Sequence, residues 1–338
     1  MTTARLTDTG STNTAVTAED FARLTEPYRA ELLAHCYRML GSVHDAEDQV
    51  QETLVRAWRS FDRFEGRSSL RTWLYRIATN ACLRAIETRR RRPLPSGLGA
   101  PAEPGTRPGP ANPELGWLEP IPDALFTAQP ADPAQVAVSR SSMRLALVAA
   151  LQYLPGRQRA VLILRDVLGW SAAEVADLLG VTTVAVNSLL QRARSAVGRA
   201  APAESEIREP DRGRERALLD RYAAAFEAAD VTGLLRLLRA DAGFEMPPQP
   251  AWFTGRAAIG RFLDDLVLTR PGRFRLRPAA ANGQPALAGY QRDADGVYRA
   301  HGIQVITVTG PLISHVVSFN DPGLFAVFGL PPVLDQAG

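Results

Sequence analysis

The sequence has 338 residues, 46% of them hydrophobic and 22% charged, which is ordinary for a globular protein and excludes a largely disordered chain. The formal net charge is only +3, so the total points to no class of partner. All 39 basic residues are arginine, the side chain that best matches phosphates and base edges. No apolar run reaches the ~18 residues of a membrane span, and residues 1–20 lack a signal-peptide core. We expect a cytoplasmic protein.

The chain divides into segments of different character. Between residues 93 and 133 lie eleven of the 25 prolines, a density that no packed helix or central strand accommodates. Helical apolar spacing precedes and follows this stretch. We therefore predict a multidomain protein with a disordered N-terminus (1–20), an all-α domain (21–92), a Pro-rich linker (93–138), a second all-α domain (139–200), a short linker (201–212) and an α+β domain (213–332).

The two cysteines, Cys36 and Cys82, lie within apolar helical patterns. Neither has the Cys/His spacing of a metal site, so we interpret both as buried reduced thiols and expect no metal or cofactor.

Charge is segregated within residues 21–92. Asp48, Gln51 and Glu52 lie at positions i, i+3 and i+4 and share one helix face. From Arg56 to Arg92 the sign reverses, with eleven arginines against three acidic residues. An acidic face beside a basic one can hold a basic protein and an anionic polymer at the same time.

The second helical segment has the pattern of a DNA-reading helix pair. Ser171 and Glu174 form a capping box, Gly180 suits a sharp turn, and Thr182 can cap the next helix. Side chains able to pair with base edges then fall on the exposed face of that helix. They are Thr183, Asn187, Ser188, Gln191, Arg192 and Arg194.

These motifs resemble a bacterial RNA polymerase sigma factor of the extracytoplasmic-function (ECF) group. "DAEDQVQETLVRAW" is similar to region 2.2, "SSLRTWLYRIATNACLRAIETRRR" to regions 2.3 and 2.4, and "LQYLPGRQRAVLILRDVLGWSAAEVADLLGV" with "LLQRAR" to region 4. The resemblance covers about residues 21–200 and has the family's order. It implies that the protein catalyses no reaction and that it directs core polymerase to promoter DNA.

The resemblance also assigns roles to residues. Asp48, Gln51 and Glu52 would bind the clamp of the β′ subunit, residues 154–164 the β flap, and the Pro-rich linker would enter the active-site channel. Asn80 would border the pocket for an extruded −10 base. Phosphate contacts would come from Arg84, Arg89, Arg90, Arg91 and Arg92. The residues predicted to contact the −35 element are the six named above for the helix pair. The family often has basic residues where Asn187 and Leu189 stand here, so the family's −35 sequence cannot be assigned to this protein.

The last segment predicts two helices followed by strands, with turns at "ANGQ" and "DADG". This order resembles a SnoaL-like domain of the nuclear-transport-factor-2-like superfamily, an α+β cone with a curved antiparallel sheet and an apolar pocket. Residues that could line this pocket are Phe226, Phe244, Met246, Trp252, Phe253, Phe262, Tyr290, His301 and Gln304.

A minimal sigma factor does not need this third domain. We expect it to pack on both helical domains and to regulate them in cis, with an unidentified small ligand as a further partner. Two alternatives are a stand-alone helix-turn-helix regulator and a SnoaL-type enzyme with a DNA-binding leader. The enzyme would need a carboxylate beside His301 or His315, which sequence alone does not place.

Overall fold

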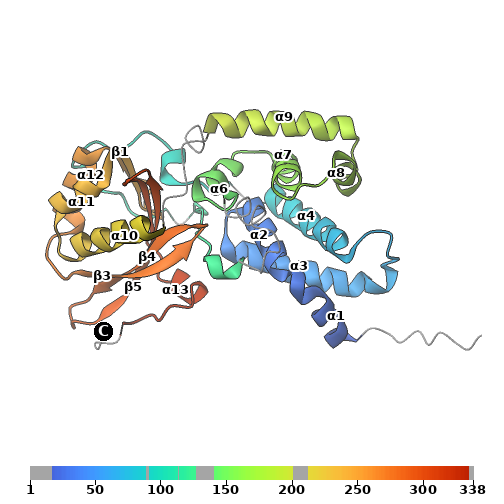
Figure 1. Cartoon of the computed structure of the whole chain (residues 1–338), viewed down its shortest axis with the longest axis horizontal. Coiled ribbons are helices and arrows are strands. Elements are labelled where there is room, and N and C mark those ends of the chain that lie inside the picture. Colours follow the sequence, from blue (N-terminus) through green and yellow to red (C-terminus); the bar gives the residue numbers. More distant parts are fainter. Residues whose placement is uncertain (1–16, 89–90, 113, 127–140, 201–211, 335–338) are drawn as a thin grey trace, which may run out of the picture.

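The computed structural model describes residues 17–88, 91–112, 114–126, 141–200 and 212–334. In Figure 1 the helical domains lie on the right and the α+β domain on the left. Within the described residues no single helix is long and apolar enough to cross a bilayer; α8 and α9 reach that length and composition only when counted together, and they are bent by 100°.

The first helical domain is a bundle of α1 (Ala18–Thr25), α2 (Arg29–Leu40), α3 (Val43–Ser60) and α4 (Leu70–Thr88), with short 3₁₀ turns at Glu26–Tyr28 and Phe61–Arg63. A capping box at Thr17 starts α1, so the helix begins before the boundary predicted at residue 20. Gly41, at φ 71°, ends α2 in the left-handed conformation. Cys36 and Cys82 are buried free thiols, as predicted.

The second helical domain contains α6 (Leu145–Leu151), α7 (Gly156–Leu162), a π turn (Ile163–Val167), α8 (Ala172–Leu179) and α9 (Thr183–Ala200). The capping box of Ser171 and Glu174 opens α8, Gly180 at φ 64° closes it, and Thr182 Oγ1 accepts from Ala185 N at 3.2 Å. With 100° between α8 and α9, the predicted helix-turn-helix is confirmed.

Between the two helical domains, the described part of residues 93–126 has little regular structure beyond 3₁₀ turns at Pro95–Gly97 and Asp123–Leu125. This stretch is not a free tether, because Leu94, Leu118 and Ile121 are buried in the common core. Residues 127–140 lie outside the described residues.

The third domain begins with α10 (Arg212–Glu227) and α11 (Val231–Leu237), and α12 (Arg256–Phe262) runs into a π turn (Leu263–Val267). Its strands are β1 (Leu238–Glu245), β2 (Trp252–Thr254), β3 (Phe274–Ala281), β4 (Gln284–Arg292), β5 (Tyr298–Thr309) and β6 (Leu312–Phe319), in the order β2-β1-β6-β5-β4-β3. The β1–β6 pair is parallel, so the sheet is mixed where we expected it to be wholly antiparallel. The connection from β1 to β6 crosses the whole meander, which allows the two strands to run the same way.

The two faces of this sheet bury different cores. One face, with Phe244, Leu276 and Ile306, packs under α10, α11 and α12. The other face, with Ala286 and Val305, packs with α13 (Leu324–Val327) and belongs to the same apolar cluster as the two helical domains. The sheet therefore separates the core of its own domain from the core that it shares with the rest of the chain.

The two helical domains also contact each other directly. Arg159 in α7 is 4% exposed, and its guanidinium donates to the carbonyl of Met39 in α2 and to Gln152 Oε1 at 2.8 Å. Burial lowers the pKa of Arg159 to about 10, so the group stays charged at neutral pH. Four carbonyl or amide oxygens depend on this one cation.

We expect Arg159→Leu to lower the melting temperature by several degrees, because each buried acceptor left without a donor costs about 1–3 kcal/mol. Differential scanning calorimetry measures the change. Arg157→Leu, at an exposed position of the same helix, is the control and should melt as the wild type does. Equal melting of all three proteins would contradict the role of Arg159.

Candidate polymerase and promoter surfaces

The predicted polymerase-binding residues lie together on α3. Asp48 and Gln51 are exposed and Glu52 is half-buried beside its i+4 partner Arg56. They line one wall of an open groove of about 670 Å³, and Arg84 of α4 lies in the other wall. The acidic face and one predicted phosphate contact are therefore neighbours across a single groove.

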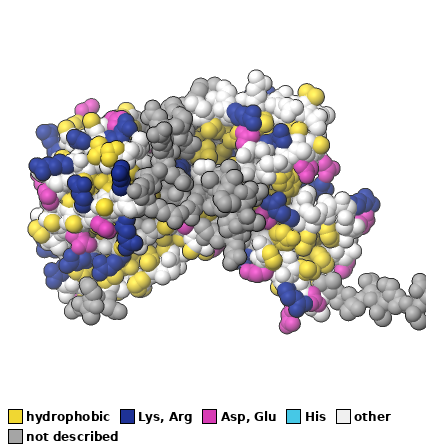
Figure 2. Space-filling model, in the orientation of Figure 1, with side chains coloured by type: hydrophobic (Ala, Val, Ile, Leu, Met, Phe, Trp, Pro, Cys, Tyr) yellow, Lys and Arg dark blue, Asp and Glu magenta, His cyan; other side chains and the backbone are white. Residues whose placement is uncertain are grey.

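Apolar surface adjoins this groove. Figure 2 shows hydrophobic side chains gathered over α1 and α3, where the exposed large residues are Leu24, Val55 and Trp58. Aromatic and aliphatic side chains beside a charged rim are typical of a protein-binding surface. Trp58 is 40% exposed, and its ring lies 5.3 Å from that of Phe21, measured between centroids.

The predicted −10 residues divide into groups. Asn80 is half-buried and Arg84 is exposed on α4, while Arg89 and Arg90 lie outside the described residues. Arg91 is exposed and stacks over the ring of Tyr153 at 4.1 Å from its centroid.

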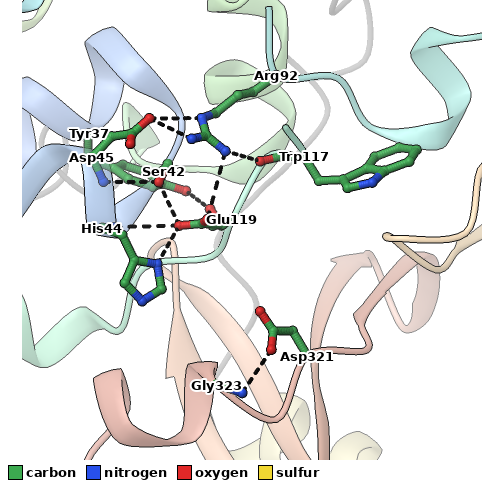
Figure 3. Close-up of polar contacts among 9 residues, drawn as sticks. All are labelled: Tyr37, Ser42, His44, Asp45, Arg92, Trp117, Glu119, Asp321 and Gly323. Carbon is green, nitrogen blue, oxygen red and sulfur yellow. Dashed lines mark hydrogen bonds and ion pairs between the residues drawn. The ribbon is translucent and has the colours of Figure 1, made fainter. Parts of the chain in front are cut away.

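Arg92 lies where the prediction did not expect it. Figure 3 shows its guanidinium directed at Asp45 and at the linker. Nη2 lies 2.6 Å from Asp45 Oδ2, Nη1 donates to Trp117 O at 3.0 Å, and Glu119 Oε1 lies 3.8 Å from Nη1. The Arg92 side chain is 18% exposed and pairs with carboxylates in this arrangement. We had expected it to be free to contact a DNA phosphate. Asp45, in the first turn of α3, is itself buried.

Glu119 extends this network along the linker. Its Oε2 accepts from Ser42 Oγ at 2.7 Å and lies 3.0 Å from His44 Nδ1, and its carbonyl accepts from the Tyr37 hydroxyl at 2.7 Å. Burial raises the pKa of Tyr37, which keeps its proton available as a donor. Sequence reasoning missed Glu119, because only the folded linker brings it to α2 and α3.

The predicted −35 residues share the outer face of α9. Thr183, Asn187, Ser188, Gln191 and Arg192 are all exposed. Arg194 is exposed as well, but its guanidinium makes two bonds to Asp166, at 2.9 and 2.7 Å. Five of the six side chains are therefore available to base edges without breaking an ion pair.

The third domain contains a cavity beneath α10. Phe226, Phe244, Met246, His301 and Gln304 line it, as expected. Four other predicted residues do not. Phe253 stacks on Phe262 within the core, Trp252 donates to Gly99 O of the linker, and Tyr290 lies on the opposite face against Phe325. A bulge between Gly289 and Tyr290 shifts the register there, which pattern reading could not foresee.

The two candidate catalytic histidines have different surroundings. The neighbouring ring of His301 is Phe274, and no acidic residue lines its cavity. His315 does have a carboxylate, with Nε2 2.7 Å from Glu245 Oε1, but this pair lies away from the cavity and Glu245 also accepts from Ser96 N of the linker at 2.7 Å. Among the described residues no group of three His, Cys, Asp or Glu could hold a metal ion.

The fold and these surfaces define a transcription factor with two helical nucleic-acid-binding units. Family models match in the same order: "Sigma-70 region 2" over residues 24–92, "Sigma-70, region 4" over 144–197 and "SnoaL-like domain" over 219–316. The ECF RNA polymerase sigma factor SigG of Mycobacterium tuberculosis is 53% identical over 317 residues, covering 93% of this chain and 85% of SigG.

SigJ of Mycobacterium tuberculosis, also an ECF RNA polymerase sigma factor, is 30% identical over 304 residues, covering 84% of this chain and 86% of SigJ. The crystal structure of SigJ superposes with a TM-score of 0.60 at 25% identity, covering 92% of this chain and all of that one. The chain belongs to the ECF sigma factors of RNA polymerase. It binds core polymerase and directs it to promoter DNA, which excludes the stand-alone regulator.

We expect Asp48→Arg to abolish binding to core polymerase, because it reverses the charge at the centre of the α3 face without touching the core. Co-purification with core polymerase measures the effect, and circular dichroism checks the fold. Asp264→Arg makes the same charge change at an exposed position of the third domain and should bind normally. A normal holoenzyme with Asp48→Arg would disprove this assignment.

Arg192→Ala should lose about 1–3 kcal/mol of discrimination at a single −35 base pair, because a bidentate arginine contact is specific for one base. Holoenzyme binding to promoters substituted at each −35 position measures it. Arg194→Ala should change specificity little, since Asp166 already engages its guanidinium. A uniform loss over all sequences would instead mark Arg192 as a phosphate contact.

Proposed function

We propose that this sigma factor is regulated in cis, with its third domain and linker holding regions 2 and 4 in a closed arrangement that opens on the polymerase. The observation that carries the proposal is the position of Asn282, in the turn between β3 and β4. Its Nδ2 donates to the Tyr37 hydroxyl at 2.8 Å and to Met143 O at 2.9 Å, and its Oδ1 accepts from Ile121 N at 3.1 Å. One amide thus joins region 2, the linker and the segment entering region 4.

The spacing of promoter elements supports this proposal. Elements at −10 and −35 are separated by about 85 Å of B-DNA, at 3.4 Å per base pair. Here α4 touches the reading unit of region 4, through an ion pair of Arg76 with Asp177 and a ring contact of Tyr75 with Trp170 at 5.6 Å. A chain in this arrangement cannot reach both elements at once, so the two regions must separate before they read a promoter.

Tethering makes such regulation effective. A domain on the same chain has an effective concentration in the millimolar range, so a weak contact surface is enough to hold the closed form. Opening breaks the contacts of the closed form. The free energy of polymerase binding to α3 and region 4 can offset this loss.

We further propose the subunit contacts. The acidic face of Asp48, Gln51 and Glu52, with the apolar side chains next to it, suits the β′ clamp, and residues 154–164 suit the β flap. Asn80 and Arg84 with the arginines at 89–92 would meet the −10 element. Opening of the closed form would release Arg92 from Asp45 and Glu119 for phosphate contact.

We also infer that the third domain acts without turnover. The cavity that holds His301 has no carboxylate in its lining, and burial lowers the pKa of His301, so a protonated general acid is disfavoured there. In the third domain His315 pairs with Glu245, and this carboxylate also accepts two hydrogen bonds from Ser96 of the linker.

Asn282→Gly tests the closed arrangement. The change keeps the turn, since Asn282 and Gly283 have φ angles of 59° and 66° that glycine adopts freely, and it removes only the amide that joins the three parts. We expect a larger distance between labels in regions 2 and 4 by single-molecule fluorescence, and more run-off transcript at limiting core polymerase.

The control is Ala294→Gly in the exposed turn between β4 and β5, which should behave as wild type in both measurements. An unchanged label distance in Asn282→Gly would contradict the closed arrangement. A larger distance with unchanged transcription would contradict its regulatory role.

A further inference from the structure

The outer face of α9 carries one large apolar side chain that is not among the six predicted −35 contacts. Val184, in the first turn of this helix, is 73% exposed. The other large apolar side chains that lie exposed in the described parts of the chain are only 40–47% exposed. Single exposed aliphatic side chains are common on protein surfaces, so the position of Val184 has to decide whether it has a role.

Val184 shares a helix face with predicted base contacts. It begins a stripe at positions i, i+3, i+4 and i+7 of α9, and every member of this stripe is exposed. The members are Val184, Asn187, Ser188 and Gln191. A different face of α9 packs into the core of the helical domains, through Val186, Leu190 and Ala193. Val184 is therefore the apolar end of an otherwise polar reading face.

The fold of the chain gives no reason for a valine at this position. A β-branched side chain is a weaker helix former than alanine. The start of α9 is already capped by the Thr182 hydroxyl, which accepts from Ala185 N at 3.2 Å. At 73% exposure Val184 buries little apolar area, so it contributes little to the stability of the fold. Burial of this side chain by a partner would instead favour binding.

The stripe suits the major groove of DNA in placement and in length. α9 forms an edge of the molecule (Figure 1), and a recognition helix enters the groove with its N-terminal residues at the base edges. Because an α-helix rises about 1.5 Å per residue, Val184 and Gln191 lie about 10 Å apart along α9, close to three base-pair steps of about 3.4 Å. Val184 would thus meet the base pair at one end of the element.

The chemistry of the groove selects the base. Thymine presents a methyl group in the major groove, whereas the edges of guanine, cytosine and adenine present hydrogen-bond donors and acceptors there. A valine side chain has two methyl groups and neither a donor nor an acceptor. Against the other three bases it would cover polar groups without pairing them, which costs free energy.

We propose that Val184 is a specificity-determining residue of promoter recognition, with its methyl groups packed on the C5 methyl of one thymine at the end of the −35 element. This goes beyond the proposed regulation in cis and does not depend on it, because the contact forms in the holoenzyme. It rests on α9 being the helix that meets the −35 element, which the Arg192→Ala variant tests separately.

The test uses holoenzyme assembled from the full chain and core polymerase. Promoters selected from genomic fragments first give the preferred −35 element. Each thymine of this element is then replaced by deoxyuridine, which lacks only the C5 methyl. We expect one position at which the replacement weakens wild-type binding about fourfold, the effect of one buried carbon group. At that position Val184→Ala should bind the thymine and the uracil promoter with equal affinity.

Val333→Ala is the matched control. It makes the same change at a valine of the third domain that is 40% exposed, and it should keep the fourfold preference for the methyl group. Circular dichroism checks the fold of Val184→Ala, which should be as helical as the wild type because alanine is the better helix former.

A preferred −35 element without thymine, or one in which every thymine tolerates deoxyuridine, would overturn the proposal. An equal loss of affinity for all promoters in Val184→Ala would also overturn it, since the side chain would then contact core polymerase or the DNA backbone. A preference for the methyl group that persists in Val184→Ala would assign the contact to a neighbour such as Thr183, and the proposal would be wrong.

Discussion

The closed arrangement depends on the hydrogen bonds of one fully buried amide. Asn282 has 0% exposure, and among the described residues its side chain bonds with Tyr37, Ile121 and Met143, which belong to three different parts of the chain. Inside the protein an unpaired amide would be costly, so the turn that carries Asn282 fits only where all three partners meet. Leu118 and Ile121 of the linker belong to the apolar core that the helical domains share with the sheet.

The ion network of region 2 follows from the same packing. Once the linker is held at Ile121, Glu119 lies beside α3 and joins Asp45 near Arg92. Arg92, which follows α4, is then paired with carboxylates, and these have the negative charge that a phosphate would offer it. Under the proposed function DNA and the linker would compete for the same cation, so opening and promoter contact would be coupled by charge.

The sheet of the third domain connects two surfaces. On β5, Gln304 faces the cavity while Ile303 and Val305 face the shared core, because successive side chains alternate across a strand. The cavity and the interface are therefore neighbours along one strand. Along β5 the cavity and the shared core therefore lie on opposite sides of the same strand.

Local pattern was enough for much of this protein. The capping box at Ser171, the turn at Gly180 and the outward face of α9 could be read directly, because cap chemistry and helical period are properties of a few adjacent residues. The acidic face of α3 was predictable for the same reason. The Asn-Gly turn was also predictable, since few other residue pairs adopt two positive φ angles.

Contacts between distant residues needed the tertiary structure. The pairing of Arg92 with Asp45, the role of Glu119, the parallel β1–β6 pair and the removal of Tyr290 from the cavity all join residues far apart in the chain or depend on a bulge. Sequence alone determined the class of protein and the exposed polar face of α9, because both depend on helical period and charge among neighbouring residues. Only the fold decided that one amide closes the three domains together, because that requires partners 139 to 245 residues away.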